Sequence, residues 1–362
     1  MGAASLGVNM ASPYSSGGMN AAINHAEPLY GEKLHAVAQT LRNFSGPIYI
    51  VTHVDPDGDA VGSSLGLALA LEAMGKRVFW ICQPPRYLRF LAGDYPNSLP
   101  ISRVPEGALL VVLDAAEPDR VEGAPVEGYV INIDHHGTNP RFGDLAVVDP
   151  SKAATAQIVK DLIDALGVAW TPAIATPVLT GMITDTGNFA FANTTPELLR
   201  TAADLVAHGV AYAELTDRLR LRPPGYFQLL GKVLSTVEFH FGGLLVTAHL
   251  PPGANGQNGG DALPSPSDPR GVAGEEDSDD FVGTIRYAEG SLVAVFLRQR
   301  GPDTKLSIRS RGRVSAQNIA VKLGGGGHVP AAGATLRGVG LSDAYGKLLP
   351  VVEEELKRAG YL

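Results

Sequence analysis

Histidine and aspartate residues gather at several places along the chain in patterns suited to metal binding. His53, Asp57 and Asp59 lie within the short segment His-Val-Asp-Pro-Asp-Gly-Asp. Like charges this close repel one another unless a cation or a proton compensates them. A solvated acidic turn explains the segment about equally well, because Asp, Pro and Gly are turn formers. Mixed imidazole and carboxylate ligands suit manganese, iron or zinc.

Further acidic turns follow apolar segments. Asp114 follows a strand-like run, and a single Asp in that position is more often a helix cap than a ligand. The triplet Asp134-His135-His136 is more informative, because one of two adjacent histidines can bind a metal while the other faces a substrate. A surface loop with two exposed histidines is the alternative. Asp185, in Thr-Asp-Thr-Gly, is again either a cap or a ligand.

Taken together, these side chains form a candidate set of metal ligands. The set is His53, Asp57, Asp59, Asp114, His135 and Asp185. Six ligands with one shared carboxylate can hold two divalent cations, and a metal pair about 3.5–4 Å apart activates a water and binds a phosphoryl oxygen. This chemistry hydrolyses phosphate esters without a nucleophilic side chain. The sequence has no Walker P-loop.

A basic segment near the C-terminus offers the complementary charge. Between residues 285 and 325 the net charge is +6, in a chain whose net charge is −8. The basic residues are Arg286, Arg298, Arg300, Lys305, Arg309, Arg311, Arg313 and Lys322. Arginine recognises phosphate in a bidentate manner, although a solvated basic strand face is the alternative. The run Gly324–Gly327 before His328 either cradles a phosphate with its backbone or is a flexible linker.

The elements that must position these residues alternate between strands and helices. We expect strands over 47–52, 77–81, 108–113 and 129–133, and helices over 31–44, 60–75, 152–166, 172–183 and 196–208. This alternation predicts an α/β domain with a mostly parallel sheet. His53, Asp114 and Asp134 then lie at the carboxyl ends of three strands, which is the edge where open α/β sheets bind ligands.

The pattern changes after residue 210, which indicates a second and smaller domain. We expect a helical connection over 210–235, strands over 237–249, 282–298 and 305–309, and a helix over 315–323. The predicted organisation is a disordered tail over 1–27, a catalytic domain over 28–215, a helical linker over 216–235, and a substrate-binding domain over 236–362 that contains a flexible insertion at 251–280.

Length and composition exclude several classes of protein. The 362 residues suffice for about two domains, and the single cysteine, Cys82, excludes a disulfide framework and a zinc site built from several thiolates. The net charge of −8 argues against a protein that coats duplex DNA. No apolar run is long enough to span a membrane, and residues 1–20 lack the pattern of a signal peptide, so we expect a cytoplasmic protein.

The ordered set of motifs resembles that of the DHH phosphoesterases over residues 30–362. The motifs are His53-x-x-x-Asp57-Gly-Asp59-Ala-x-Gly-Ser, Asp114, Asp134-His135-His136, Asp185 and Gly324-Gly-Gly-Gly-His328. The resemblance implies an N-terminal, mostly parallel-sheet DHH domain, a smaller C-terminal α/β DHH-associated domain, and a cleft between them. The insertion over 251–280 is longer and richer in Gly and Pro than the family pattern leads us to expect, and the Ala/Gly/Ser-rich tail before residue 28 has no counterpart in it.

The resemblance also implies roles for individual residues. One manganese would be held by His53, Asp57 and Asp114, and a second by Asp59, Asp114, His135 and Asp185, with Asp114 bridging. The catalytic pair would be His136, which contacts the scissile phosphate and assists the leaving oxygen, and Asp134, which supports it. The substrate-binding residues would be Gly325, Gly326, Gly327, His328, Arg309 and Arg311. Cobalt or magnesium could replace manganese.

The length and the compact glycine motif are most similar to a short bacterial branch of the family. Its members hydrolyse very short RNA (nanoRNA) and 3′-phosphoadenosine 5′-phosphate (PAP), and some relatives hydrolyse cyclic di-AMP or pApA. We therefore expect short RNA, short single-stranded DNA and small nucleotides as substrates, and neither duplex DNA nor a membrane as a partner. The alternatives are an inorganic pyrophosphatase, a RecJ-like exonuclease on long strands, and a nucleotide sensor without activity. The sequence does not decide whether the chain forms a homodimer.

Overall fold

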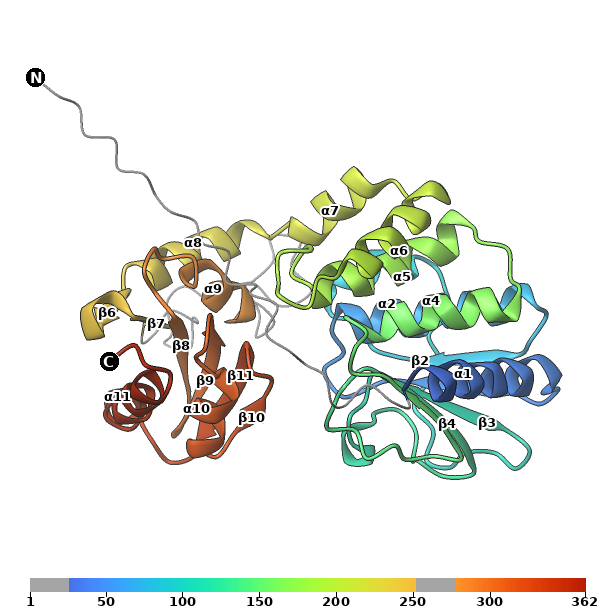
Figure 1. Cartoon of the computed structure of the whole chain (residues 1–362), viewed down its shortest axis with the longest axis horizontal. Coiled ribbons are helices and arrows are strands. Elements are labelled where there is room, and N and C mark those ends of the chain that lie inside the picture. Colours follow the sequence, from blue (N-terminus) through green and yellow to red (C-terminus); the bar gives the residue numbers. More distant parts are fainter. Residues whose placement is uncertain (1–25, 252–277) are drawn as a thin grey trace, which may run out of the picture. The chain divides into compact units, whose positions relative to one another are not determined.

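The chain forms two compact units, which meet in the sequence between Leu219 and Arg220, and each unit is described by itself (Figure 1). The computed structural model describes residues 26–251 and 278–362. The predicted tail and the predicted insertion therefore lie almost wholly outside the described residues. Helix α1 (Ala26–Asn43) starts earlier than the predicted 31 and runs to the predicted end.

The N-terminal unit contains a five-stranded sheet in which every strand is parallel to its neighbours. In spatial order the strands are β2 (Val78–Ile81), β1 (Ile48–Val51), β3 (Leu109–Leu113), β4 (Tyr129–Asp134) and β5 (Leu145–Val148). The inner strands β1 and β3 are buried along their whole length, as their unbroken apolar runs require. The sequence did not predict β5, because its apolar run spans only residues 145–148.

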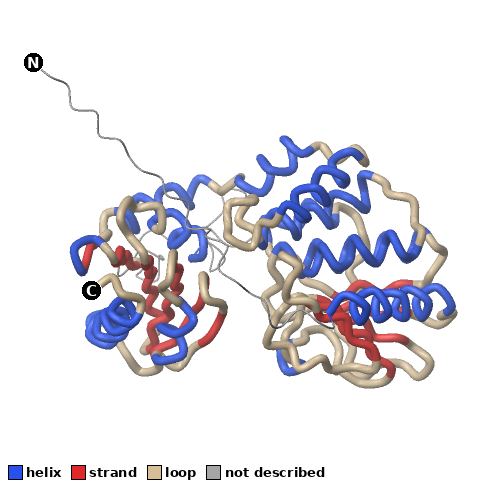
Figure 2. The backbone as a smooth tube through the Cα atoms, viewed as in Figure 1, coloured by secondary structure: helices blue, strands red, loops and turns tan. Residues whose placement is uncertain are grey.

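Helices cover one face of this sheet and loops cover the other (Figure 2). The longer helices after α1 are α2 (Gly58–Ala73), α4 (Thr155–Leu166), α5 (Pro172–Asp185), α6 (Pro196–Ala207) and α7 (Tyr212–Arg220). The shorter ones are η1 (Arg86–Leu88), α3 (Arg89–Ala92) and η2 (Pro118–Arg120). None of the helices within residues 26–251 and 278–362 is long and apolar enough to cross a membrane.

Small residues bring α2 and α5 unusually close together. A Cβ at Gly62 of α2 would collide with the carbonyl oxygen of Pro177 and would lie 2.8 Å from the backbone nitrogen of Gly181, both in α5. Only glycine permits this approach, so the Gly/Ala/Ser composition of α2 reflects helix packing. The close approach fixes the first turn of α2 beside the last turn of α5, where acidic residues of the candidate set lie.

The C-terminal unit is a six-stranded mixed sheet with helices on both faces. Its order is β10 (Gly326–Gly327), β11 (Ala331–Leu336), β9 (Asp303–Ser310), β8 (Val293–Arg300), β7 (Leu245–His249) and β6 (Glu238–His240). Only β7 and β8 pair in parallel. Helices α10 (Ala316–Lys322) and α11 (Leu341–Arg358) pack on one face, and α8 (Pro224–Leu234) and α9 (Ser278–Ile285) on the other.

Two strand predictions in this unit need correction. The predicted strand over 282–298 is wrong in its first part, because α9 extends to Ile285 and β8 begins only at Val293. The buried side chains Phe281, Val282 and Ile285 have helical spacing, and a turn separates the two elements. The predicted strand over 237–249 is interrupted by a 3₁₀ turn, η3 (Phe241–Gly243), where Gly242 and Gly243 have positive φ.

Candidate metal centre

The carboxyl ends of the parallel strands bring the candidate ligands together. His53 lies just after β1, Asp114 directly after β3, and Asp134 ends β4. Asp57 caps the N-terminus of α2, where its Oδ1 accepts hydrogen bonds from the backbone nitrogens of Asp59 and Ala60 at 3.0 and 3.1 Å. One carboxylate oxygen of Asp57 therefore caps α2, a role that the sequence did not predict for this residue.

One group of possible ligand atoms contains His53, Asp57 and Asp114. One atom from each lies within 4.8 Å of the others. His53 Nε2 is 3.7 Å from Asp114 Oδ2 and 4.0 Å from Asp57 Oδ1. The other ring nitrogen, Nδ1, lies 2.7 Å from the carbonyl oxygen of Val54. That contact orients the ring so that Nε2 faces the carboxylates. In metal-binding histidines, the nitrogen that does not bind the metal is commonly held by such a partner.

A second group contains Asp59, His135 and Asp185. His135 Nε2 lies 3.3 Å from Asp185 Oδ2, 3.8 Å from Asp114 Oδ1 and 4.0 Å from Asp59 Oδ2. Asp185 is the last residue of α5, so the helix end presents its carboxylate to the sheet edge. The carbonyl oxygen of Lys152 is 3.4 Å from His135 Nδ1 and orients this imidazole in turn.

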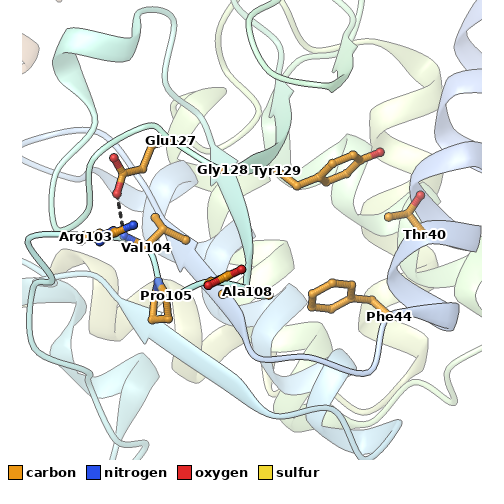
Figure 3. A pocket seen from close by; sticks show the side chains of 11 residues that line it. Thr40, Phe44, Arg103, Val104, Pro105, Ala108, Glu127, Gly128 and Tyr129 are labelled. Atoms are coloured by element: carbon orange, nitrogen blue, oxygen red, sulfur yellow. Dashed lines mark hydrogen bonds between the residues drawn. The ribbon is translucent and has the colours of Figure 1, made fainter.

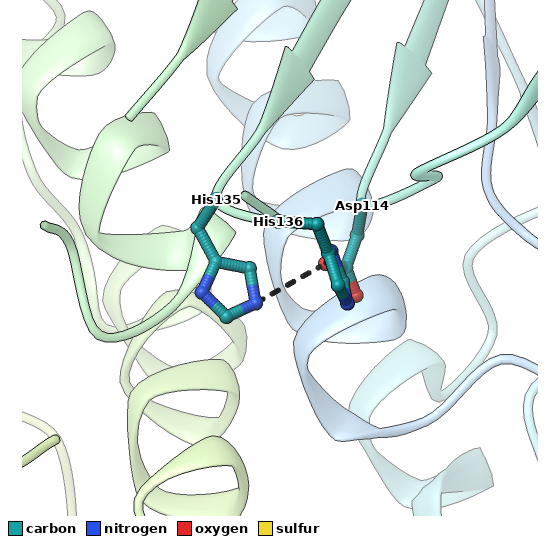
Figure 4. Close-up of side chains that lie close together, drawn as sticks. All are labelled: Asp114, His135 and His136. Carbon is teal, nitrogen blue, oxygen red and sulfur yellow. Dashed lines mark ion pairs between the residues drawn. The ribbon is translucent and has the colours of Figure 1, made fainter. Parts of the chain in front are cut away.

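Asp114 lies between these groups and contacts both. Figure 4 shows its carboxylate beside the rings of His135 and His136. The residue is buried, and its backbone has φ of 58°, in the left-handed region. Asp and Asn tolerate this region better than other residues with a Cβ. Aspartate therefore fits the backbone of this turn and can also bind a cation.

Backbone groups at the start of α4 hold the buried carboxylates in place. Thr155 N donates to Asp59 Oδ2 at 2.6 Å, and Ala156 N donates to Asp59 Oδ1 at 2.8 Å. The Thr155 hydroxyl donates to Asp114 Oδ1 at 2.9 Å. A Cβ at Gly181 would lie 2.7 Å from Asp59 Oδ1, so this glycine leaves room for the carboxylate. The sequence predicted the helix over 152–166 but not that its first N–H groups bind Asp59.

The cluster carries more negative charge than its surroundings neutralise. Burial and the charge of Asp57 raise the pKa of Asp59 to about 7. Burial and neighbouring carboxylates also raise the pKa of Asp114 and of Asp185 well above the usual range. Divalent cations relieve this repulsion, and carboxylate oxygens with imidazole nitrogens are a donor set that such cations accept. The residues therefore fit a divalent-metal site.

The raised pKa of Asp59 predicts how the metal-free protein responds to pH. The pKa is 3.8 for an unperturbed aspartate and about 7 for Asp59 in the folded chain. Between these values the folded state retains a proton that the unfolded state has lost, so the free energy of unfolding falls as pH rises. A bound cation displaces that proton. We expect Mn²⁺ to raise the melting temperature more at about pH 8 than at about pH 6, measured by calorimetry against an EDTA control. Equal increases at both values would contradict this assignment.

His136 and Asp134 form a separate pair beside the cluster. His136 Nδ1 lies 2.7 Å from Asp134 Oδ1, which also accepts hydrogen bonds from the backbone nitrogens of His135 and His136. Asn139 Nδ2 donates to Asp134 Oδ2 at 2.6 Å, a contact that the sequence did not predict. Although burial opposes ionisation, these bonds lower the pKa of Asp134 and raise that of His136. The pair thus keeps a proton on the imidazole.

The predicted substrate-binding residues lie in the C-terminal unit. Arg309 is at the end of β9, Arg311 follows it, and the glycine run leads into β10 and β11. Ser310 connects these segments, because its backbone nitrogen donates to the carbonyl oxygen of Pro330 at 3.0 Å and its hydroxyl to that of Val329 at 2.8 Å. His328 is exposed and begins a tight turn, in which its backbone nitrogen donates to the carbonyl oxygen of Ala331 at 2.7 Å.

The positions of the glycine run differ in whether the surrounding structure requires glycine. A Cβ at Gly325 would lie 2.6 Å from Ala334 Cα, and one at Gly327 would lie 2.6 Å from Ala332 Cα, so both positions need glycine to pair with β11. Gly326 is exposed, and a Cβ there would meet nothing within 4 Å. Packing within the unit therefore does not require glycine at 326.

This difference separates stability from binding at the glycine run. We expect Gly326→Ala to leave the melting temperature within about 2 °C of the wild type while raising the KM for the substrate about tenfold. Gly327→Ala, at a φ of 135°, should lower the melting temperature in the same assay and serves as the matched comparison. An unchanged KM in Gly326→Ala would exclude a close ligand contact at this position.

A hollow at the opposite edge of the N-terminal sheet is distinct from the cluster. Its volume is about 630 Å³, and Phe44, Tyr129 and Thr40 project into it (Figure 3). The lining segments 103–108 and 127–129 lie at the amino ends of β3 and β4. None of its lining residues is a candidate ligand. The hollow is therefore not part of the candidate metal centre.

Comparison with known proteins agrees with this geometry. Residues 47–182 match the model "DHH family, N-terminal domain", and residues 273–358 match the "DHHA1 domain". The bifunctional oligoribonuclease and PAP phosphatase NrnA of Thermus thermophilus is 66% identical, over 94% of this chain and 99% of the relative. The protein of the same name from Bacillus subtilis is 28% identical, over 80% and 89%.

The fold has a counterpart among solved structures. The crystal structure of an exopolyphosphatase-related protein from Bacteroides fragilis matches with a TM-score of 0.78 at 22% sequence identity. The match covers 91% of this chain and 98% of the other. At this identity it shows a shared fold, whereas the Thermus relative shows shared ancestry along nearly the whole length. The chain belongs to the DHH family, with an N-terminal DHH domain followed by a DHHA1 domain.

Proposed function

We propose that this chain is a metal-dependent phosphoesterase that hydrolyses very short oligoribonucleotides to mononucleotides and PAP to AMP. The observation that carries the proposal is the 66% identity to the oligoribonuclease and PAP phosphatase of Thermus thermophilus, over nearly all of both chains. The acidic and histidine cluster at the carboxyl edge of the sheet supports the reaction class, because the same donor set suits phosphate-ester hydrolysis.

Two divalent cations, most suitably manganese, are the proposed cofactors. His53, Asp57 and Asp114 would hold one, and Asp59, Asp114, His135 and Asp185 would hold the other. Imidazole nitrogens among the donors favour manganese over magnesium, although both accept carboxylates, and cobalt accepts the same set. Two bound cations supply positive charge beside the phosphoryl oxygens and lower the pKa of a bound water.

The residues of this chain perform the remaining steps. Asp134 holds His136 through Nδ1 and raises its pKa, which favours the protonated imidazole. The protonated His136 contacts the scissile phosphate and donates its proton to the departing oxygen. In the C-terminal unit, Arg309, Arg311, His328 and Gly325–Gly327 bind another phosphate or the base of the substrate. These residues thus recognise short substrates by a second anchoring point.

A direct comparison of substrates tests this function. Purified protein with Mn²⁺ is expected to hydrolyse a 5′-labelled RNA dinucleotide and PAP rapidly, to act poorly on an RNA of about 20 nucleotides, and to lose activity in EDTA. Preference for the long strand would favour a RecJ-like exonuclease, and preference for cyclic di-AMP would favour the cyclic dinucleotide as substrate. Turnover of pyrophosphate alone would indicate a pyrophosphatase. Binding without any turnover would indicate a sensor.

A further inference from the structure

Tyr287 is an exposed aromatic residue surrounded by arginines. It lies in the turn after α9, and 66% of its surface is accessible. The guanidinium carbon of Arg311 is 5.3 Å from the centre of its ring, and that of Arg286 is 5.7 Å away. Arg311 Nη2 also donates a hydrogen bond to the carbonyl oxygen of Arg286, which fixes the two segments beside each other. Most of the tyrosine ring is nevertheless open to a ligand.

This arginine–tyrosine group is continuous with the predicted substrate-binding residues of the same unit. The backbone nitrogen of Arg311 donates to the carbonyl oxygen of Leu292 at 2.9 Å, which joins the end of β9 to the segment before β8. The neighbouring Ser310 bonds the turn that carries His328, through Val329 and Pro330. The segment Ser310–Arg311 therefore contacts both Tyr287 and the turn that carries His328.

The positive charges of this surface lie close enough to influence one another. Burial, together with the charges of Arg311 and Arg309, lowers the pKa of Arg286 from its usual range, while Tyr287 acts in the opposite direction. A phosphate bound here would relieve the repulsion between the guanidinium groups. A surface that combines an open aromatic ring with arginines is typical of single-stranded nucleic-acid binding, where the ring stacks on a base and the arginines bind phosphates.

We propose that Tyr287, with Arg286 and Arg311, binds the base and phosphate of an RNA nucleotide beyond the one that is being hydrolysed. This proposal rests on the proposed function, because it assigns a place to the remainder of an RNA substrate. PAP carries a single base and has no further nucleotide to occupy this position. Tyr287 would thus bind oligonucleotides but make no contact with the mononucleotide substrate. One active site could then accept both classes of substrate.

Kinetics of substitutions at Tyr287 test the proposal. We expect Tyr287→Ala to raise the KM for the trinucleotide pApApA about tenfold relative to the KM for PAP, because one stacked base contributes about that much affinity. Tyr287→Phe retains the ring and should restore the wild-type KM. Phe239→Ala is the matched control, since Phe239 is 58% exposed on the edge strand β6 of the same unit. A trinucleotide that lacks the bases of all nucleotides other than the hydrolysed one should not respond to Tyr287→Ala.

Two results would overturn the proposal. One is an equal change, or no change, in the KM for pApApA and for PAP. The other is an increase in the KM for pApApA that is as large in Tyr287→Phe as in Tyr287→Ala. That result would mean that Tyr287 maintains the structure of the turn and does not stack on a base. Fluorescence anisotropy of labelled pApApA on the EDTA-treated protein measures the same preference without turnover. If the wild type hydrolyses neither substrate, the proposed function fails, and the anisotropy still decides the role of Tyr287.

Discussion

Replacing Asp114 with asparagine is expected to lower hydrolysis of an RNA dinucleotide by about 10³-fold or more, while the metal-free protein stays folded. Asp114 lies between both groups of proposed ligands, within 3.8 Å of His135 Nε2 and 3.7 Å of His53 Nε2. Loss of its negative charge weakens both proposed metal positions together. No other side chain of the cluster contacts both histidines at such distances among the described residues.

Asparagine is the informative substitution because it preserves the local structure. It tolerates the left-handed backbone at position 114 and still offers an oxygen to the hydroxyl of Thr155. The pKa of Asp114 is raised by burial and by its acidic neighbours, so its ionisation destabilises the folded state. Without metal, Asp114→Asn should therefore melt at a temperature equal to or above that of the wild type at about pH 8.

Calorimetry with and without Mn²⁺ completes this test. Addition of Mn²⁺ should raise the melting temperature of the wild type and change that of Asp114→Asn little. Asp204→Asn is a matched control, because Asp204 forms a surface ion pair with Lys160 at 2.9 Å and lies outside the cluster. The control should retain both the activity and the response to Mn²⁺. An active Asp114→Asn variant would contradict the shared role of this carboxylate.

His136→Gln is expected to lower kcat on an RNA dinucleotide by about 10²–10⁴-fold. Asp134 holds the wild-type imidazole and raises its pKa, and in the proposed function this imidazole supplies the proton that the departing ribose oxygen needs. Glutamine retains hydrogen-bonding capacity but cannot transfer a proton. The same variant should lose much less activity on a p-nitrophenyl ester of a nucleotide, because nitrophenolate departs without protonation.

The ratio of the two losses separates proton donation from binding. Asn139→Ala offers a milder comparison, since the side chain of Asn139 donates to Asp134 Oδ2, while its backbone nitrogen, which alanine retains, donates to the carbonyl oxygen of His136 at 3.2 Å. This variant should lower kcat on both substrates by a similar factor of about 10–100-fold, which is smaller than the loss in His136→Gln on the dinucleotide. Such a loss is expected of a residue that positions another. Equal losses on the dinucleotide and the nitrophenyl ester in His136→Gln would assign His136 to binding alone.

Much of the N-terminal unit was predictable because its signals are local. Strands β1 and β3 are unbroken apolar runs, and each is followed by a residue of the cluster at a fixed edge of a parallel sheet. The proximity of Asp57, His53 and Asp59 follows from their spacing in the sequence. Asp185 is different, because only the packing of α5 against α2 brings it to His135.

The features that the sequence did not predict depend on contacts between distant segments. The first turn of α4 binds Asp59 across 96 residues of chain, and no local pattern marks that contact. In the C-terminal unit, the segment 282–298 was predicted to be one strand, although its first part is helical. The glycine run suggested phosphate binding as a whole, whereas Gly325 and Gly327 are explained by their close approach to β11.

The number of metal ions bound per chain tests the central claim most directly. Metal-free protein is dialysed against Mn²⁺ at increasing concentration, and the bound metal is measured by elemental analysis. The arrangement of His53, His135 and the carboxylates around Asp114 predicts a plateau at two ions per chain, and fewer than one in Asp114→Asn at the same concentration. A plateau at one ion or none in the wild type, or two ions retained in Asp114→Asn, would contradict a pair of metals that share this carboxylate.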